Sequence, residues 1–242
     1  METRSGMSEP GRGRRRGVED LQLRDKVGVF RDREHAGQTL ARLLSPELGH
    51  HPLVLAIPAG GVPVAAAMAQ ALSLPLDVAV VSKVTLPWNT ESGYGAVAFD
   101  GTVQLNEPLV ARLALTQEDI ERGVARTRAK VAHRVELLRG GAPAPELEGR
   151  ALILVDDGLA SGFTMHVAVQ AVRRAGAARV VVAVPTAHDD AVDWLLPEVD
   201  ALYCANVRRG GRFAVADAYA RWYDVSDEEV LRALGRPAPG AH

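Results

Sequence analysis

Cysteine is almost absent from this chain of 242 residues, since Cys204 is the only one. A single thiol cannot form an internal disulfide, and there is no group of thiols to hold zinc or an iron–sulfur cluster. Because Cys204 lies in an apolar run, we expect it to be a small core residue rather than a nucleophile. The sequence thus excludes disulfide-stapled scaffolds and thiol-rich metal proteins.

Long apolar runs are also missing. No stretch approaches the ~18 apolar residues that cross a bilayer, and the first residues do not resemble a secretory signal. Hydrophobic residues make up 47% of the chain and charged residues 24%, which is usual for a globular domain. We therefore expect a soluble protein that works in the cytoplasm and has no membrane partner.

Positive charge is concentrated at the start of the chain, where five arginines stand among glycines before residue 17. Such a composition cannot form a core, so we interpret residues 1–25 as a disordered tail, 26–235 as one folded domain and 236–242 as a flexible C-terminus. Acidic groups outnumber basic ones outside the first sixteen residues, and this makes nucleic-acid binding by the folded part an unfavoured hypothesis. Only the tail could contact RNA or an acidic partner, and a solvated extension is the favoured interpretation.

The rest of the chain alternates between strand-like and helix-like patterns. The strand-like runs are apolar throughout, which is typical of strands that are buried on both faces. We therefore predict an α/β fold with a Rossmann-like parallel sheet flanked by helices. The expected strands are 53–57, 78–81, 152–155, 180–184 and 201–204, and the expected helices are 33–44, 62–72, 162–175 and 189–196.

A second pattern interrupts this alternation between residues 83 and 139. Residues 83–99 contain glycines and a proline and are predicted to form a loop or hairpin, followed by a short strand over 102–105. Thr116, with Asp119 three residues later, predicts the start of a helix that ends near Arg139. The exposed face of that helix carries Arg122, Arg126, Lys130 and Arg134, and we interpret it as a solvated basic face rather than a partner site.

The stretch LILVDDGLASGFT, residues 152–164, carries the chemistry. In a parallel sheet, ligands bind beyond the carboxyl ends of the strands, which is where Asp156 and Asp157 stand. Neighbouring residues alternate in direction, so one acid can face a ligand while the other supports the loop. Acids suit hydroxyls or Mg²⁺, and amides at the following helix start suit phosphate, so the stretch predicts a sugar-phosphate site. A plain strand-to-helix turn with a capping aspartate is the alternative.

Two other reaction classes do not fit the spacing. A P-loop needs a Gly-Lys-Ser/Thr ending, and no lysine follows Lys130. An aspartyl-phosphate phosphatase needs two acids one residue apart, whereas these two are adjacent.

The same thirteen residues resemble the signature of type I phosphoribosyltransferases, which bind 5-phosphoribosyl 1-diphosphate (PRPP). The resemblance covers about residues 30–231 and includes FRDREHAG, LAIPAGGVPVA, GAVA, LNEPLV and VSDEEV in order. It implies a small variable hood over the fold, Mg²⁺ as cofactor and a homodimer. It also implies that Asp156 and Asp157 hold the ribose hydroxyls and the metal, and that Ala160, Ser161, Gly162, Phe163 and Thr164 bind the 5-phosphate.

The resemblance assigns the remaining site residues too. Ala59, Gly60 and Gly61 correspond to the pyrophosphate turn, and residues 83–95 resemble the mobile loop over the reacting centre. Ala59 stands where that branch of the family usually has a basic residue, and Ala218 where an aromatic is expected. Lys83 is the best candidate for a catalytic cation, with Arg31 and Arg33 as weaker candidates for a phosphate contact.

The implied function is a Mg²⁺-dependent transfer of the phosphoribosyl group of PRPP to a nucleobase or other nitrogenous acceptor, with release of pyrophosphate. The alternatives are a PRPP-binding regulator without turnover, which Ala59 favours, and a protein for another sugar phosphate. Aromatic faces stack on bases, so Tyr219 and Trp222 are predicted to bind the acceptor. Further aromatic candidates are Tyr203, Phe213 and Tyr223.

Overall fold

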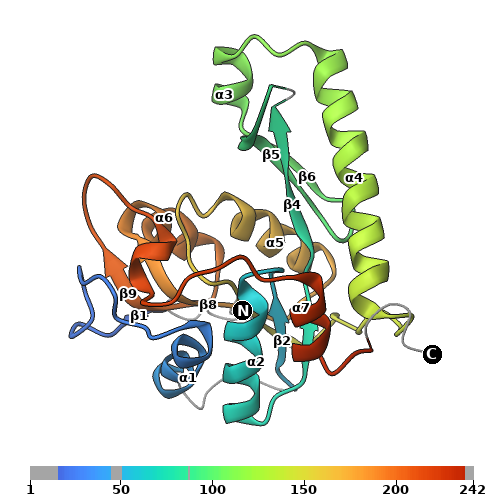
Figure 1. The fold of residues 1–242 in the computed structure, drawn as a ribbon. Helices are drawn as coiled ribbons and strands as arrows, with labels where there is room; N and C mark the ends of the chain where they lie inside the picture. Colours follow the sequence, from blue (N-terminus) through green and yellow to red (C-terminus); the bar gives the residue numbers. More distant parts are fainter. Residues whose placement is uncertain (1–15, 45–50, 87, 238–242) are drawn as a thin grey trace, which may run out of the picture.

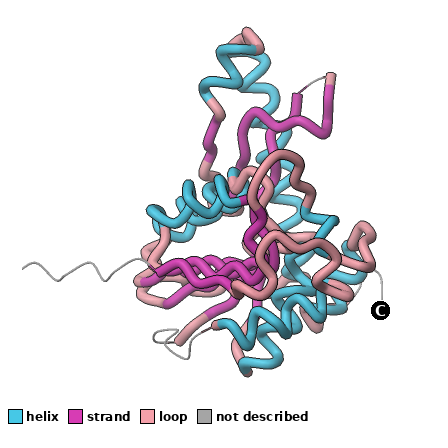
Figure 2. Tube along the Cα trace, turned by 90° about the vertical axis from the view of Figure 1, so that its left-hand side faces the viewer, coloured by secondary structure: helices cyan, strands magenta, loops and turns pink. Residues whose placement is uncertain are grey.

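The computed structural model describes residues 16–44, 51–86 and 88–237, and its main body is a parallel sheet between two layers of helices (Figures 1 and 2). The six strands lie in the order β1-β9-β8-β7-β2-β3, and every neighbouring pair is parallel. The predicted α/β class with a flanked parallel sheet is confirmed. The strands are β1 (Arg16–Glu19), β2 (Leu53–Ala56), β3 (Leu76–Val78), β7 (Ala151–Val155), β8 (Arg179–His188) and β9 (Ala201–Arg208).

Side-chain alternation along the strands fills a core on each face of the sheet. In β7, Ile153 and Val155 join the core that includes the helices α1 and α2, whereas Leu152 and Leu154 join the core under α5 and α6. All four side chains are fully buried, which explains why this strand is apolar throughout. The helices of the body are α1 (Arg33–Leu43), α2 (Gly61–Leu72), α5 (Phe163–Arg174), α6 (Asp189–Leu195) and α7 (Asp227–Ala233).

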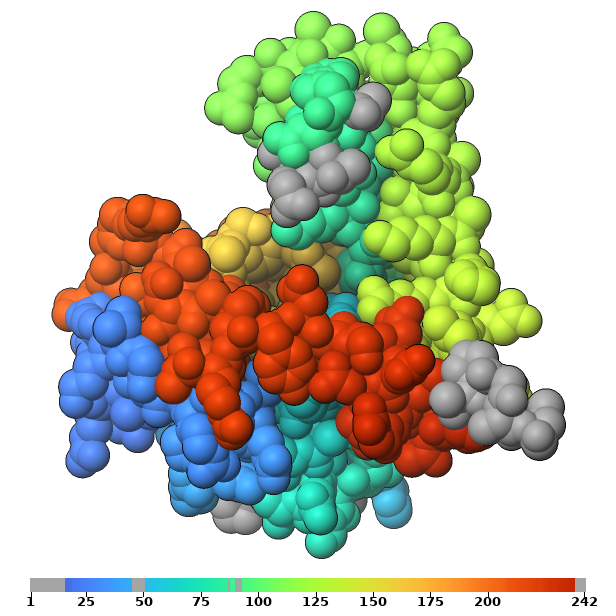
Figure 3. Space-filling view, viewed as in Figure 1, coloured from blue at the N-terminus to red at the C-terminus, as the bar shows by residue number. Residues whose placement is uncertain are grey.

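A second unit, here called the hood, stands above the body (Figure 3). It consists of a three-stranded antiparallel sheet in the order β4-β5-β6 and two helices. The predicted hairpin and the short strand after it are confirmed, and a capping box between Thr116 and Asp119 begins the long helix as expected. The hood elements are β4 (Val81–Leu86), β5 (Asn89–Ala98), β6 (Val103–Leu105), α3 (Glu107–Arg112) and α4 (Gln117–Arg139).

The strand predicted over residues 78–81 is wrong in detail. Strand β3 ends at Val78, and β4 begins at Val81 in the other sheet. Between them the chain leaves the body and enters the hood, with Ala79 and Val80 buried. Residues 78–81 are all buried, so their apolar run predicted one strand although it joins the ends of two strands in different sheets.

Two predicted boundaries also need correction. Residues 16–25 were expected to be part of a disordered tail, yet Arg16–Glu19 form the edge strand β1 and pair with β9. Backbone pairing does not depend on side-chain hydrophobicity, so the Arg- and Gly-rich composition concealed this strand. At the other end, Arg236 was placed in a flexible C-terminus, but its guanidinium lies 3.0 Å from the buried carboxylate of Asp77. The remainder of both predicted flexible segments, 1–15 and 238–242, lies outside the described residues. No helix in the described ranges is long and apolar enough to cross a membrane.

Candidate functional site

The residues predicted to bind the ribose, the 5-phosphate and the pyrophosphate lie near one another where β2 and β7 end. These strands are neighbours with Ala56 paired to Val155, and the Ile57 amide donates to the Val155 carbonyl at 2.8 Å. The turn after β2 and the acid pair after β7 therefore emerge side by side, and the N-terminus of α5 follows a few residues later. This is the carboxyl edge of the sheet, where the sequence predicted a ligand.

The two neighbouring acids have different surroundings. Asp156 lines two adjoining cavities of about 300 and 190 Å³, and it shares both with Lys83 and Thr164. Asp157 lines neither of them and instead accepts hydrogen bonds from the Arg33 guanidinium, at 3.0 Å from Nε and 2.9 Å from Nη2. The alternation expected of adjacent residues is thus realised, with one acid facing the cavities and the other facing the protein.

Arg33 is held on every side. Its side chain is only 7% exposed, its Nη1 donates to the Tyr223 carbonyl at 2.8 Å, and its guanidinium carbon lies 4.0 Å from the centre of the Trp222 ring. The sequence had offered Arg33 as a weaker candidate for a phosphate contact, but a guanidinium so enclosed is committed to Asp157. Arg31, the other such candidate, is exposed and pairs with Asp32 at 3.0 Å.

Burial is the main influence on the ionisation of both acids. Burial, together with the adjacent Asp157 carboxylate, raises the pKa of Asp156 well above its ordinary value of 3.8. Burial also raises the pKa of Asp157, while the Arg33 guanidinium opposes that rise. Among the described residues, Asp157 is hydrogen-bonded to a cation, Arg33, whereas Asp156 is hydrogen-bonded to none. Asp156 is therefore the acid that is suited to bind a cationic or hydroxyl-bearing ligand.

The glycines of the predicted pyrophosphate turn are required by the close approach of the acid pair. A Cβ on Gly60 would lie 1.9 Å from Asp157 Oδ2, and one on Gly61 would lie 2.7 Å from the Val155 carbonyl oxygen. The peptide bond between Pro58 and Ala59 is cis. The close approach of Gly60 and Gly61 shows that the turn and the acid pair pack directly against each other.

Replacing Gly60 by alanine should test this packing. The added methyl group must displace Asp157 from Arg33, and overpacking of this kind typically costs about 1–3 kcal/mol of folding free energy. The measurement is chemical unfolding of Gly60→Ala beside Gly17→Ala, whose new Cβ would make only an ordinary contact at 3.6 Å with Leu196. Equal unfolding free energies for the two variants would contradict the close approach.

The predicted 5-phosphate turn borders the 190 Å³ cavity with all of its members, Ala160 to Thr164. Gly162 precedes the first turn of α5 with φ at +73°, a conformation that favours glycine. The Ser161 hydroxyl accepts from the Phe163 amide at 3.4 Å, and the Phe163 ring stacks on Trp194 with centroids 6.1 Å apart. The bulky Phe163 is therefore accommodated beside the turn, and the helix N-terminus remains suited to an anion.

Lys83 lies on β4 at the root of the hood, is exposed and borders both cavities. The larger cavity has a second cation that the sequence did not identify. Lys130, on α4, lines it together with Lys83, Asp156 and Pro58. The sequence pattern places Lys130 on a solvated basic face, and its position in the cavity lining corrects that interpretation. A helical pattern alone does not show which flank of a helix faces a cavity.

The predicted base-binding aromatics lie elsewhere. Tyr219 is 6% exposed, its ring packs on Phe30 with centroids 5.6 Å apart, and its hydroxyl donates to the Asp157 carbonyl at 2.6 Å. Its face is therefore not open to stack on a base, which corrects that prediction. Trp222 is 40% exposed but lies over Arg33, outside both cavities. Of the weaker candidates, Tyr203 is buried, whereas Phe213 is partly buried and Tyr223 is exposed.

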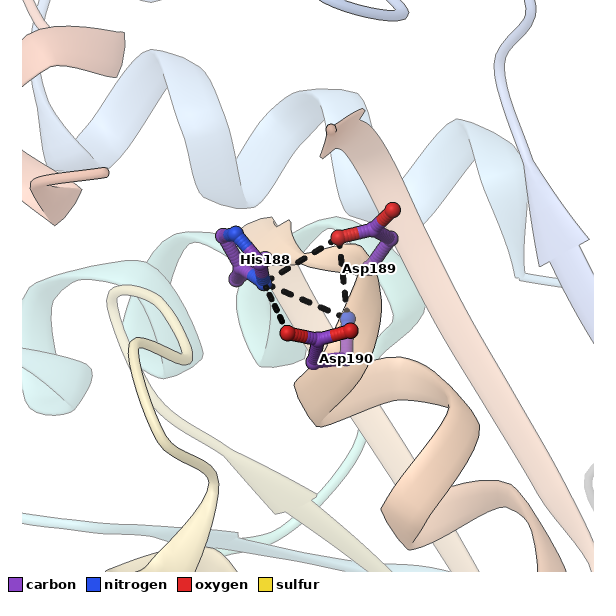
Figure 4. A group of neighbouring side chains, drawn as sticks. All are labelled: His188, Asp189 and Asp190. Atoms are coloured by element: carbon purple, nitrogen blue, oxygen red, sulfur yellow. Dashed lines mark hydrogen bonds and ion pairs between the residues drawn. The ribbon is translucent and has the colours of Figure 1, made fainter. Parts of the chain in front are cut away.

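A cluster of His188, Asp189 and Asp190 lies where β8 ends (Figure 4). His188, at the end of β8, has its Nδ1 3.1 Å from Asp189 and 3.5 Å from Asp190. The Asp190 amide also donates to the same nitrogen at 3.2 Å. These contacts begin the short helix α6, so the group is accounted for as a helix start.

Comparison with known proteins agrees with this geometry. A family model described as the phosphoribosyl transferase domain matches residues 33–208. A protein of Mycobacterium tuberculosis strain H37Rv, named provisionally as a phosphoribosyl transferase, is 36% identical over 208 residues, and so is its counterpart in strain CDC 1551. These alignments cover 86% of this chain and 47% of each relative, so the chain spans about half their length.

A solved structure is similar over nearly its whole length. The crystal structure of TT1426 from Thermus thermophilus is 38% identical to this chain and has a TM-score of 0.69. The match covers 85% of this chain and 97% of that one. The body and the hood thus have a counterpart in a known structure.

Proposed function

Because the chain belongs to the phosphoribosyl transferase domain family, of the type I fold, we propose that it binds PRPP with Mg²⁺ and transfers the phosphoribosyl group to a nitrogenous acceptor, with release of pyrophosphate. The observation that carries the proposal is the position of Asp156 between two cavities. One is bordered by the turn Ala160–Thr164 and the other by Pro58, which leads into the turn Ala59–Gly61.

This arrangement matches the three parts of PRPP. The amides at the start of α5 and the hydroxyls of Ser161 and Thr164 would hold the 5-phosphate. Asp156 would accept hydrogen bonds from the ribose hydroxyls. The pyrophosphate group would extend toward Pro58 and the glycine turn, past the two lysines. The combined cavities are in the size range of small-molecule sites, which run from about 300 to 1,000 Å³.

The donor set fits Mg²⁺. This ion is usually held by one or two carboxylates together with substrate phosphates and waters. Asp156 supplies one carboxylate that faces both cavities, and substrate phosphates and waters would supply the other ligands. Asp157, which the resemblance gave as a second metal ligand, is turned toward Arg33 and lines neither cavity. When bound, the ion would neutralise charge on the pyrophosphate and bring it against the ribose hydroxyls.

The protein's own part in the reaction is placement of charge. A nitrogen nucleophile attacks C1 of the ribose as the bond to pyrophosphate breaks, and the ring passes through an oxocarbenium-like state. The Asp156 carboxylate would favour that positive charge, and the Lys83 ammonium would favour the negative charge on the leaving oxygens. Pyrophosphate leaves with the electron pair of the broken C1–O bond, and the proton of an N–H acceptor passes to the departing pyrophosphate or to water as the new C1–N bond forms.

Release of pyrophosphate tests the proposal and separates it from the regulator hypothesis. PRPP, Mg²⁺ and a panel of purines, pyrimidines and simple amines are incubated with the protein, and pyrophosphate is measured by a coupled assay. An enzyme should release pyrophosphate with at least one acceptor, and Lys83→Met should lower that rate more than it lowers PRPP affinity. Tight PRPP binding without release by any acceptor would favour the regulator, for which the uncharged Ala59 is the supporting observation.

A further inference from the structure

The turn that leads out of β2 has no charged side chain. Residues 57–61 are Ile-Pro-Ala-Gly-Gly, so any cation beside a pyrophosphate group here must come from another element. The backbone of the turn is partly committed as well, because the Gly61 amide donates to the Ile57 carbonyl at 3.1 Å. A polyanion bound at this turn would therefore need neutralising groups from across the cleft.

The cleft supplies two such groups from the hood. The 300 Å³ cavity is lined by Ile57, Pro58, Asp156 and Thr164 from the body, and by Lys83 and Lys130 from the hood. Lys83 comes from β4 and Lys130 from α4, so the two ammonium groups approach from different elements. With two cations and one acid, the lining favours an anion over a neutral or cationic ligand.

Lys130 is free to reach the cleft. It is exposed and enters no ion pair or hydrogen bond within the described ranges, whereas Arg122 and Arg134 on the same helix are paired with acids. Thr127, one turn earlier, and Val131 beside it are buried on the inward face of α4. Lys130 thus stands on the flank of the inward face, from which a long side chain can extend its ammonium group along the surface into the cavity.

The use of lysine rather than arginine at position 130 is consistent with its place beside the cavity. The chain has only three lysines, at positions 26, 83 and 130, in a sequence that otherwise uses arginine. Two of these three line the same cavity. A lysine ammonium is a compact charge on a flexible stem, which suits oxygens whose position shifts as a bond breaks, whereas arginine suits a fixed two-pronged contact.

We propose that Lys130 binds the pyrophosphate group and is, beside Lys83, the second cation that compensates for the uncharged turn after β2. This inference deepens the proposed function and rests on it for the identity of the anion. Lys83 and Lys130 both belong to the hood, so together they bring two hood elements, β4 and α4, to the leaving-group site.

Titration of inorganic pyrophosphate with Mg²⁺ tests the assignment directly. Lys130→Met should weaken pyrophosphate binding about 10- to 100-fold, the range expected for loss of one hydrogen bond to a charged group. Lys130→Arg should retain most of the affinity. Binding of ribose 5-phosphate, which has no pyrophosphate group, should be unchanged in Lys130→Met.

Arg128→Met is the matched control. Arg128 is also exposed and unpaired among the described residues of α4, but it does not line the cavity, so its loss should leave pyrophosphate binding unchanged. Wild-type affinity in Lys130→Met, or an equal loss in Arg128→Met, would overturn the proposal. If the wild type binds pyrophosphate but not PRPP, the function proposed above fails, while the Lys130 comparison still decides whether this is an anion site. If the wild type binds neither, both proposals fail.

Discussion

Replacing Asp156 by asparagine is expected to weaken PRPP–Mg²⁺ binding about 100-fold or more, since loss of even outer-shell partners of a metal ligand costs 10- to 100-fold. The same substitution should stabilise the empty protein. Asparagine keeps the oxygen that accepts from the Asp157 amide at 2.8 Å, and it removes a charge that burial and Asp157 disfavour. Binding and stability should therefore change in opposite directions.

The pH dependence of this stabilisation has a definite sign. The pKa of Asp156 is raised in the folded state above its ordinary value of 3.8. The folded protein thus binds the Asp156 proton more tightly than the unfolded chain does. The resulting stability is complete below pH 3.8 and is lost as the pH rises through the raised pKa. Asparagine resembles the protonated acid, so the advantage of Asp156→Asn over the wild type should be small at low pH and grow as the pH rises.

Melting curves over a pH series, with calorimetric titration of PRPP at each pH, measure both effects. A gain of 1 kcal/mol corresponds to about 2–4 °C in a chain of this length. Ligand affinity of the wild type should rise over the same pH range, because a metal and a proton compete for the carboxylate. A lower melting temperature for Asp156→Asn than for the wild type at every pH would contradict the claim that burial and Asp157 disfavour the charged form of Asp156.

Replacing Arg33 by methionine is expected to cost about 3–5 kcal/mol of folding free energy, as is usual when one partner of a buried ion pair is removed. The substitution leaves Asp157 with no cation in contact in the part of the chain that the structure describes. It also removes the guanidinium that packs on Trp222 and the donor to the Tyr223 carbonyl. The melting temperature should fall by roughly 10 °C. Lysine at this position should restore only part of the loss, because it cannot reproduce the hydrogen bonds that Nε and Nη2 of Arg33 both donate to Asp157 Oδ2.

Arg31→Met is the matched control two residues away. Arg31 is 61% exposed in its ion pair with Asp32, and exposed pairs contribute about 0–1 kcal/mol. A second control adds Asp157→Asn to Arg33→Met. If the penalty comes from an unpaired buried charge, the double variant should be less destabilised than the sum of the two single variants. Similar unfolding free energies for Arg33→Met and Arg31→Met would contradict the claim that the buried Arg33–Asp157 ion pair stabilises the fold.

Much of the fold could be predicted because its signals are local. The apolar strand over residues 152–155, the capping residues Thr116 and Asp119, and the turn after β2 each carry their signal within a few positions of the sequence. The direction of Asp156 relative to Asp157 also follows from alternation along an extended chain. The edge strand β1 escaped prediction since its pairing with β9 depends on the backbone of a strand almost two hundred residues away.

The parts of the site that could not be predicted depend on contacts between distant residues. Arg33 and Asp157 are 124 positions apart, and nothing local to either distinguishes a buried partner from a surface charge. Tyr219 was misread for the same reason, because its burial comes from packing on Phe30 and from the Asp157 carbonyl. Lys130 was missed since the sequence shows the helix but not the cavity that one flank of it borders.

Calorimetric titration of PRPP with Mg²⁺ into the wild-type protein tests the central claim most directly. The account predicts saturable binding that is tighter for PRPP than for ribose 5-phosphate, because only PRPP fills both the turn Ala160–Thr164 and the cavity beside Pro58. No binding of PRPP, or tighter binding of ribose 5-phosphate, would show that this cleft is not a PRPP site and would contradict the account.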